Sequence, residues 1–171
     1  MGAQSRDMIR EAILMFSSFK TPLLAAAIGS LLLCTPALAR DYPDGGVTAA
    51  EFASELVAIG QKAKISKGSD GDPVIDATFT LGTTDIDYRI FFYGCKQDRC
   101  GSIQYHVAFD GKPDKAISWN KDNRFARAYA SGTTVHLEYD VDVEKGANSA
   151  AIQNTASRWI ALMVSGVSYA G

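Results

Sequence analysis

The sequence predicts an α+β fold, an antiparallel sheet with flanking helices in the approximate order αβββαββα. Three segments of alternating apolar and polar residues follow one another between residues 74 and 109, and short turns join them. Two more alternating segments lie between residues 124 and 143. Apolar stripes with helical spacing precede and follow these segments. Such an order is typical of an antiparallel sheet with helices packed on one side or at its ends.

The first helix is expected over Thr48–Lys62. Thr48 and Glu51 have the spacing of a capping box, in which each side chain accepts a hydrogen bond from the other residue's main-chain N–H. A turn-rich segment follows over Lys67–Pro73, and a short strand is expected before it over Ala63–Ser66. The helix carries one apolar stripe that predicts packing on a sheet, formed by Phe52, Leu56 and Ile59.

Three strands are expected over Val74–Leu81, Asp85–Tyr93 and Ser102–Phe109. Successive side chains of a strand point to opposite faces, so strict alternation predicts one apolar and one polar face. The short turns between the strands predict an antiparallel meander. Its apolar face consists of Ile75, Ala77, Phe79, Leu81, Ile86, Tyr88, Ile90, Phe92, Ile103, Tyr105, Val107 and Phe109.

The second part of the chain predicts a short helix and a strand pair. Pro113 suits the first turn of a helix, which is expected over Asp114–Lys121. Strands are expected over Arg124–Ala130 and Thr134–Val143, with a tight turn between them. The outward face of the second strand carries His136, Glu138, Asp140 and Asp142.

The last helix is expected from Asn148 or Ser149, either of which can cap it, to Gly166. Its residues at i, i+4, i+7 and i+11 form the apolar stripe of an amphipathic helix. This stripe consists of Ile152, Ala156, Trp159 and Met163.

Residues 1–39 predict a secretory signal peptide. Lys20 precedes an apolar run, Leu23–Cys34, and the small-x-small pattern ending at Ala39 places cleavage between Ala39 and Arg40. A start at Met15 would give a signal of the usual length. The run has 12 residues, whereas a membrane-spanning helix needs roughly 20, so no permanent membrane anchor is expected. The protein is therefore expected to be periplasmic or secreted.

The polar segment 40–46, rich in Gly and Pro, is expected to be a flexible arm before a single domain over residues 47–168. The chain has 17 basic and 19 acidic residues, and residues 1–39 contribute three and two of these. A mildly acidic chain without a basic patch has no electrostatic footprint for nucleic acid or for an anionic membrane.

Cys95 and Cys100 predict a disulfide across a hairpin. They enclose a polar four-residue loop between two strands, and exported chains meet an oxidising environment. A redox-active pair is an alternative, although the C-x-x-C spacing is absent. A zinc site formed with His106 and His136 is another, although four residues between the cysteines is long for such a site.

The polar faces carry candidate site residues. His106 and His136 lie mid-strand, and Asp140 and Asp142 form a carboxylate ladder near Glu138 and Glu144. Pairing across the strands with Arg124 and Arg127 explains these charges without a function; cation binding is the alternative. The chain contains neither a G-x-S-x-G motif nor a glycine-rich phosphate loop, so neither a catalytic residue nor a cofactor is assigned.

The segment Ile117–Tyr129 is the densest in aromatic, amide and arginine side chains. Trp and Arg are enriched at interface hot spots, but they also join a short helix to a sheet. Both interpretations, scaffold and binding surface, apply to its candidate residues Trp119, Asn120, Arg124, Phe125, Arg127 and Tyr129.

The runs Ile117–Asn120, Arg124–Tyr129 and Val135–Asp140 resemble the YbjN-domain family, described as bacterial sensory-transduction regulators. The cysteine pair and the closing helix with its tryptophan match the exported branch, and the resemblance covers Val47–Val167. It implies a fold similar to type III secretion chaperones and brings no established reaction, cofactor or catalytic residue.

Three functions are therefore considered. The first is an exported, non-enzymatic protein-binding or regulatory module with protein partners and self-association. The second is a small-ligand-binding or enzymatic domain with a pocket near His106, His136 and Asp140. The third is a structural protein of the cell envelope.

Overall fold

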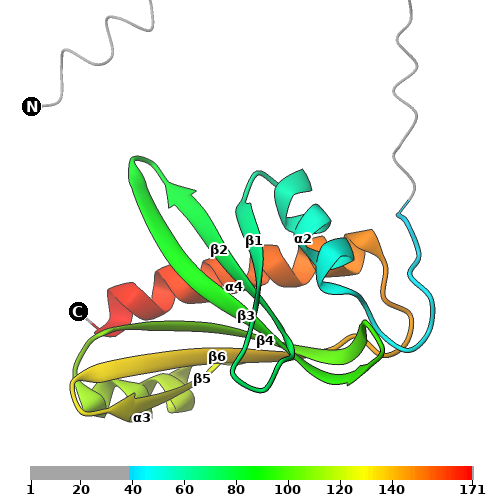
Figure 1. Cartoon of the computed structure of the whole chain (residues 1–171). Helices are drawn as coiled ribbons and strands as arrows, with labels where there is room; N and C mark the ends of the chain where they lie inside the picture. The colour runs from blue at the N-terminus through cyan, green and yellow to red at the C-terminus, as the bar shows by residue number, and fades with distance from the viewer. Residues whose placement is uncertain (1–38, 171) are drawn as a thin grey trace, which may run out of the picture. The chain divides into compact units, whose positions relative to one another are not determined.

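The computed structural model describes residues 39–170 and confirms the α+β class: a six-stranded antiparallel sheet with three helices (Figure 1). The strand order in the sheet is β1-β2-β3-β4-β6-β5. The expected signal peptide lies outside the described residues, apart from Ala39. The elements are α2 (Ala49–Ala58), β1 (Lys62–Lys67), β2 (Pro73–Leu81), β3 (Thr84–Lys96), β4 (Arg99–Asp110), α3 (Pro113–Asp122), β5 (Arg127–Ser131), β6 (Thr134–Asp142) and α4 (Ser149–Ala170).

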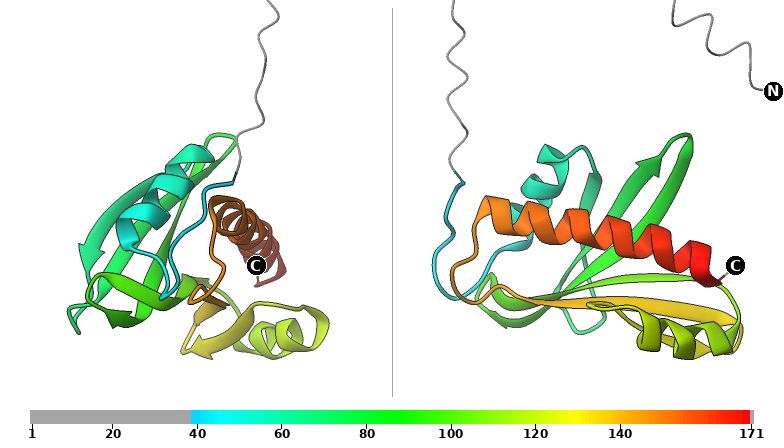
Figure 2. Two further views of the ribbon diagram at one scale, coloured as in Figure 1. Left: turned by 90° about the vertical axis from the view of Figure 1, so that its right-hand side faces the viewer. Right: turned by 180° about the vertical axis from the view of Figure 1, so that it is seen from behind.

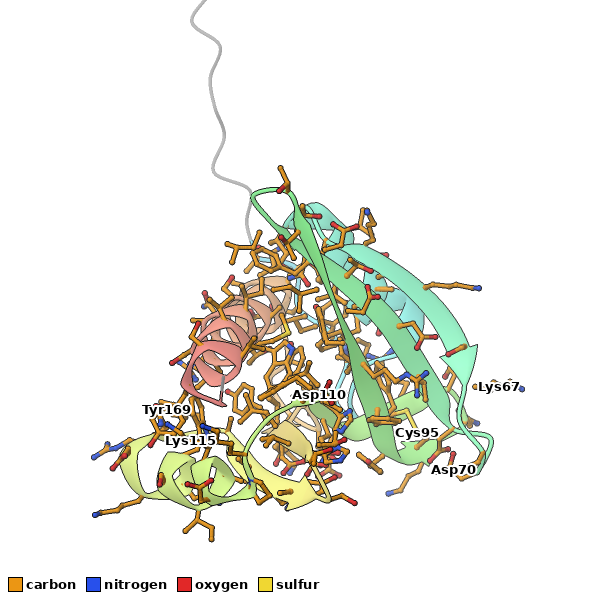
Figure 3. All side chains as sticks on the ribbon, turned by 90° about the vertical axis from the view of Figure 1, so that its left-hand side faces the viewer. Lys67, Asp70, Cys95, Asp110, Lys115 and Tyr169 are labelled. Carbon is orange, nitrogen blue, oxygen red and sulfur yellow. A yellow bond between two sulfur atoms is a disulfide. The ribbon has the colours of Figure 1, made fainter. Side chains whose placement is uncertain are left out.

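All three helices pack on one face of the sheet, which we call the inner face. Figure 2 shows α4, seen nearly end-on, in the space between the β1–β3 part of the bent sheet and β6. Side chains fill that space (Figure 3). The predicted stripe of α4 is fully buried there and consists of Ile152, Ala156, Trp159 and Met163. No helix among residues 39–170 has both the length and the apolar character needed to cross a membrane.

Aromatic rings form the centre of the core. Trp159 stacks on Tyr105 with ring centroids 5.5 Å apart, and Tyr105 stacks on Tyr139 at 5.8 Å. Phe52 of α2 meets Phe92 edge to face at 5.8 Å. These contacts join α4 and α2 to the inner face of β3, β4 and β6, as the predicted apolar faces require.

Helix α2 begins as predicted and ends earlier. The capping box is present, because the Glu51 main-chain N–H donates to Thr48 Oγ1 at 3.1 Å and the Thr48 N–H donates to the Glu51 carboxylate at 2.8 Å. The predicted end at Lys62 is wrong. Gly60 has φ +82°, a left-handed conformation that stops a helix, so Lys62 opens β1 instead.

Helix α4 runs past its predicted end at Gly166. A Cβ at that position would lie 2.9 Å from Leu137 Cδ2, so this glycine allows the helix to approach β6 closely rather than ending it. A glycine in a sequence does not distinguish these two roles.

The β3–β4 hairpin is longer and tighter than predicted. The strands reach Lys96 and Arg99, which leaves a two-residue turn in place of the expected four-residue loop. Cys95 lies opposite Cys100 in the ladder, and their sulfurs form the predicted disulfide (Cys95 is labelled in Figure 3).

Segment 40–46 was predicted to be a flexible arm, but the structure packs it against the domain. Tyr42 is buried, and its main-chain N–H donates to the Ala147 carbonyl at 2.9 Å. Arg40, the first residue after the expected cleavage point, forms an ion pair with Glu55 at 2.8 Å. The sequence has no regular pattern here, so these contacts were not predictable.

We predict that Gly46→Ala strongly destabilises the domain and that Gly45→Ala does not. Both glycines have positive φ, +98° at Gly45 and +104° at Gly46. A Cβ at Gly46 would lie 1.9 Å from the Cys100 carbonyl oxygen, whereas a Cβ at Gly45 would meet nothing within 4 Å. In urea unfolding we expect Gly45→Ala to lower the free energy of unfolding by about 1 kcal/mol, because only its positive φ is unfavourable for alanine. We expect Gly46→Ala to lower it by more than about 3 kcal/mol. Equal losses would contradict the close approach.

Candidate binding surface on the outer face of the sheet

The face of the sheet opposite the helices, which we call the outer face, has no helix packed on it among residues 39–170. The register of β3, β4, β6 and β5 brings together side chains that lie far apart in sequence. We call their central group the platform: Phe91, Tyr93, Gln104, His106, Arg127, Tyr129, His136, Glu138 and Asp140.

The two histidines meet at the centre of the platform. His106 Nε2 and His136 Nδ1 lie 3.0 Å apart, so one nitrogen donates and the other accepts. Tyr129 stacks on the His136 ring at 4.7 Å, and Phe91 meets the His106 ring edge-on at 5.8 Å. Burial lowers the pKa of His106, and the nearby Glu138 carboxylate opposes this effect.

Glu138 is only 7% exposed, although the sequence places it on a solvated face. Its carboxylate accepts hydrogen bonds from Arg127 Nε at 2.7 Å and from the Tyr129 hydroxyl at 3.0 Å. The predicted cross-strand charge pairing is therefore confirmed for Arg127. It is wrong for Arg124, whose side chain forms no ion pair within the described part of the chain.

Asp140 belongs to a second polar group on the platform. Gln104 Nε2 donates to Asp140 Oδ1 at 2.8 Å, and the Tyr93 hydroxyl lies 3.4 Å from Gln104 Oε1. Gln104 is buried, while Tyr93 is 41% exposed. The polar side chains of the platform thus hold one another in place and present the tyrosines at its margins.

Two hollows flank the platform. One, of about 570 Å³, is lined by side chains of β1 to β4 that include Asp76, Arg89 and His106. The other, of about 540 Å³, is lined by residues that include Tyr93 and Asp140. His136 lines neither hollow, so the three residues of the predicted ligand pocket do not share one cavity.

Trp119 and Asn120 lie on α3 and hold β5 to it. Trp119 Nε1 donates to the Ala126 carbonyl at 3.0 Å. The Asn120 amide donates to the Ala128 carbonyl and accepts from the Ala128 N–H, both at 2.8 Å. For these two residues the contacts are those of a scaffold, because both side chains are used to fix main-chain groups.

Phe125 differs from its neighbours in the 117–129 segment. It has φ +72°, which is rare for an aromatic residue, and its side chain is 64% exposed. The Arg158 guanidinium lies over its ring at 4.7 Å. The ring also meets the Tyr139 ring edge to face at 6.5 Å.

A metal centre receives no support from the described residues, where no group of three or more His, Cys, Asp or Glu side chains is arranged to hold an ion. The zinc alternative is wrong, because Cys95 and Cys100 are bonded to each other. The sequence did not single out Phe91, Tyr93 or Gln104, although their polar-face positions in β3 and β4 were a usable signal.

No protein-family model matches the chain, and no curated protein or solved structure is significantly similar to it. The resemblance to the YbjN-domain family therefore stays a prediction.

We predict that the stability of the domain falls with pH below about 6.5 and that His106→Gln reduces this fall. The folded-state pKa of His106 is lowered from its ordinary value of 6.5, so the unfolded chain takes up the proton first as the pH falls. The stabilisation contributed by neutral His106 is complete above the unfolded-state pKa. It is lost as the pH falls from that value through the lowered folded-state pKa. Urea unfolding at about pH 7.5 and about pH 5.5 measures the difference. An equally steep loss in His106→Gln would disprove the assignment, and Ser118→Ala is the control.

We predict that Asn120→Ala lowers the free energy of unfolding by about 1–3 kcal/mol, because it leaves the N–H and the carbonyl of Ala128 without their partner. Asn123→Ala is the matched control, since Asn123 donates one longer bond, of 3.3 Å, to the Trp119 carbonyl. Chemical denaturation of both variants should rank the loss at Asn120 above that at Asn123. The reverse order would argue against Asn120 as the residue that holds β5.

Proposed function

We propose that this chain is an exported, non-enzymatic protein-binding module of the YbjN type and that the platform is its binding surface. The observation that carries the proposal is a sheet face that no helix of residues 39–170 covers, with a hydrogen-bonded polar centre and exposed tyrosines at its margins. Tyr93 is 41% and Tyr129 44% exposed. Tyrosine and arginine are enriched at interface hot spots, and both occur here.

The internal bonds of the platform favour binding over catalysis. Glu138 accepts a hydrogen bond from Arg127, Gln104 donates one to Asp140, and the two histidines bond each other. A surface whose side chains are already held loses less conformational entropy when a partner binds. A catalytic site would instead direct such groups into a cavity, and His136 lines neither of the hollows beside it.

Site-specific photo-crosslinking in intact cells tests the proposal. A photoreactive amino acid replaces Tyr93 or Tyr129, and the control position is Ile117, a 76% exposed apolar residue of α3. We expect both platform positions to form adducts with the same protein and Ile117 to form none with it. Adducts at Ile117 alone, or none at either tyrosine, would contradict the platform as the binding surface.

A further inference from the structure

The C-terminal part of β6 has a free edge. β5 pairs with β6 only from Arg127 opposite Glu138 to Ser131 opposite Thr134. β6 continues to Asp142 and is paired with β4 on its other side throughout. Among residues 39–170, no strand lies beside Tyr139–Asp142 on the β5 side.

Four main-chain groups point to this free edge. The Val143 N–H donates to the Gly101 carbonyl on the β4 side at 2.9 Å. Because strand residues alternate in the direction of their N–H and C=O groups, those of Asp140 and Asp142 point away from β4. The main-chain groups of these two residues have no hydrogen-bond partner within residues 39–170.

Phe125 explains why the edge stays open. A strand was predicted from Arg124, which would have paired with this part of β6. Instead, the positive φ of Phe125 and a tight turn, in which the Ala126 N–H donates to the Arg124 carbonyl at 2.9 Å, lead the chain away. Trp119 fixes that path by its bond to the Ala126 carbonyl. The predicted strand therefore begins only at Arg127.

Charge defines what the edge can accept. Asp140, Asp142 and Glu144 all line the hollow of about 540 Å³ over β3, β4 and β6, and Lys96 is the one basic residue of that lining. An added strand would place alternate side chains on the same face as these carboxylates. Basic side chains at those positions would be favoured.

We propose that the free edge of β6 at Asp140 and Asp142 binds a basic, extended segment of a partner protein, which adds a strand to the sheet. The proposal rests on the protein-binding function and names the chemistry of the partner. Two copies of the chain paired symmetrically through this edge would place Asp140 and Asp142 against each other's carboxylates, which disfavours self-association there.

A designed peptide supplies the test, with the purified full chain labelled with ¹⁵N. The probe is an alternating lysine–threonine decapeptide. One control peptide has glutamate in place of lysine, and a second is N-methylated at alternate residues, which removes main-chain donors without changing the charge. We expect the first peptide to slow amide hydrogen exchange at Asp140 and Asp142, and neither control to do so.

Matched variants distinguish the effect of the carboxylates on binding from that of the main-chain hydrogen bonds. Asp140→Asn with Asp142→Asn should weaken binding of the lysine peptide about threefold or more. Asp87→Asn with Asp114→Asn removes the same charge elsewhere on the exposed surface and should leave the affinity unchanged. Equal binding of the glutamate peptide, or protection confined to β1, would overturn the proposal.

Two further outcomes identify other occupants. Slow exchange at Asp140 and Asp142 without peptide, together with sedimentation as a dimer or larger species, would overturn the proposal in favour of a second copy. Crosslinks from Tyr93 and Tyr129 in cells without any effect of the peptide would overturn it while leaving the proposed function intact. Protection by the peptide without those crosslinks would support the edge site and count against the platform.

Discussion

The stack of Trp159 on Tyr105 and of Tyr105 on Tyr139 is the contact on which the rest of the structure depends. It joins α4 to two neighbouring strands, β4 and β6, and each such aromatic pair adds about 0.5–1.5 kcal/mol to the burial of its area. The sheet bends around α4 (Figure 2), and α2 and α3 pack on the same face beside it. One face therefore supplies the core, and the other carries the platform.

The alternating pattern predicted the elements well because each strand has one buried and one open face. The three helices and five of the strands match the predicted order αβββαββα, and the sixth, β1, corresponds to the short strand expected before the turn-rich segment. The boundaries were harder to predict where one residue type has two roles. Gly60 ends α2, whereas Gly166 lets α4 continue against Leu137. Phe125 shortens β5 through a positive φ that no local sequence pattern indicates for an aromatic residue.

The platform was predictable only in part. Tyr129, Arg127, Asp140 and the histidines were named as candidates from the sequence, but their grouping depends on the register between strands. Glu138 was expected to be solvated because it shares a strand face with the polar His136 and Asp140, yet Arg127 and Tyr129 from β5 cover it. Burial of a polar residue on an open face results from such cross-strand contacts, which a single strand does not encode. Phe91 and Tyr93 were overlooked although the alternation of β3 places both on its polar face.

The edges of the sheet differ in how they are protected from association with another strand, and the edge of β6 at Asp140 and Asp142 differs from the others. Unpaired strand edges invite association, and proteins protect them with charge or with cover. One edge strand is β1, which carries Lys62, Lys64 and Lys67. The other edge strand is β5, where the Asn120 side chain forms hydrogen bonds with the N–H and the carbonyl of Ala128. The remaining edge, at Asp140 and Asp142, has no paired strand within residues 39–170. Its acidic side chains would repel an acidic strand and favour a basic one, which is the physical basis of the partner proposed for this edge.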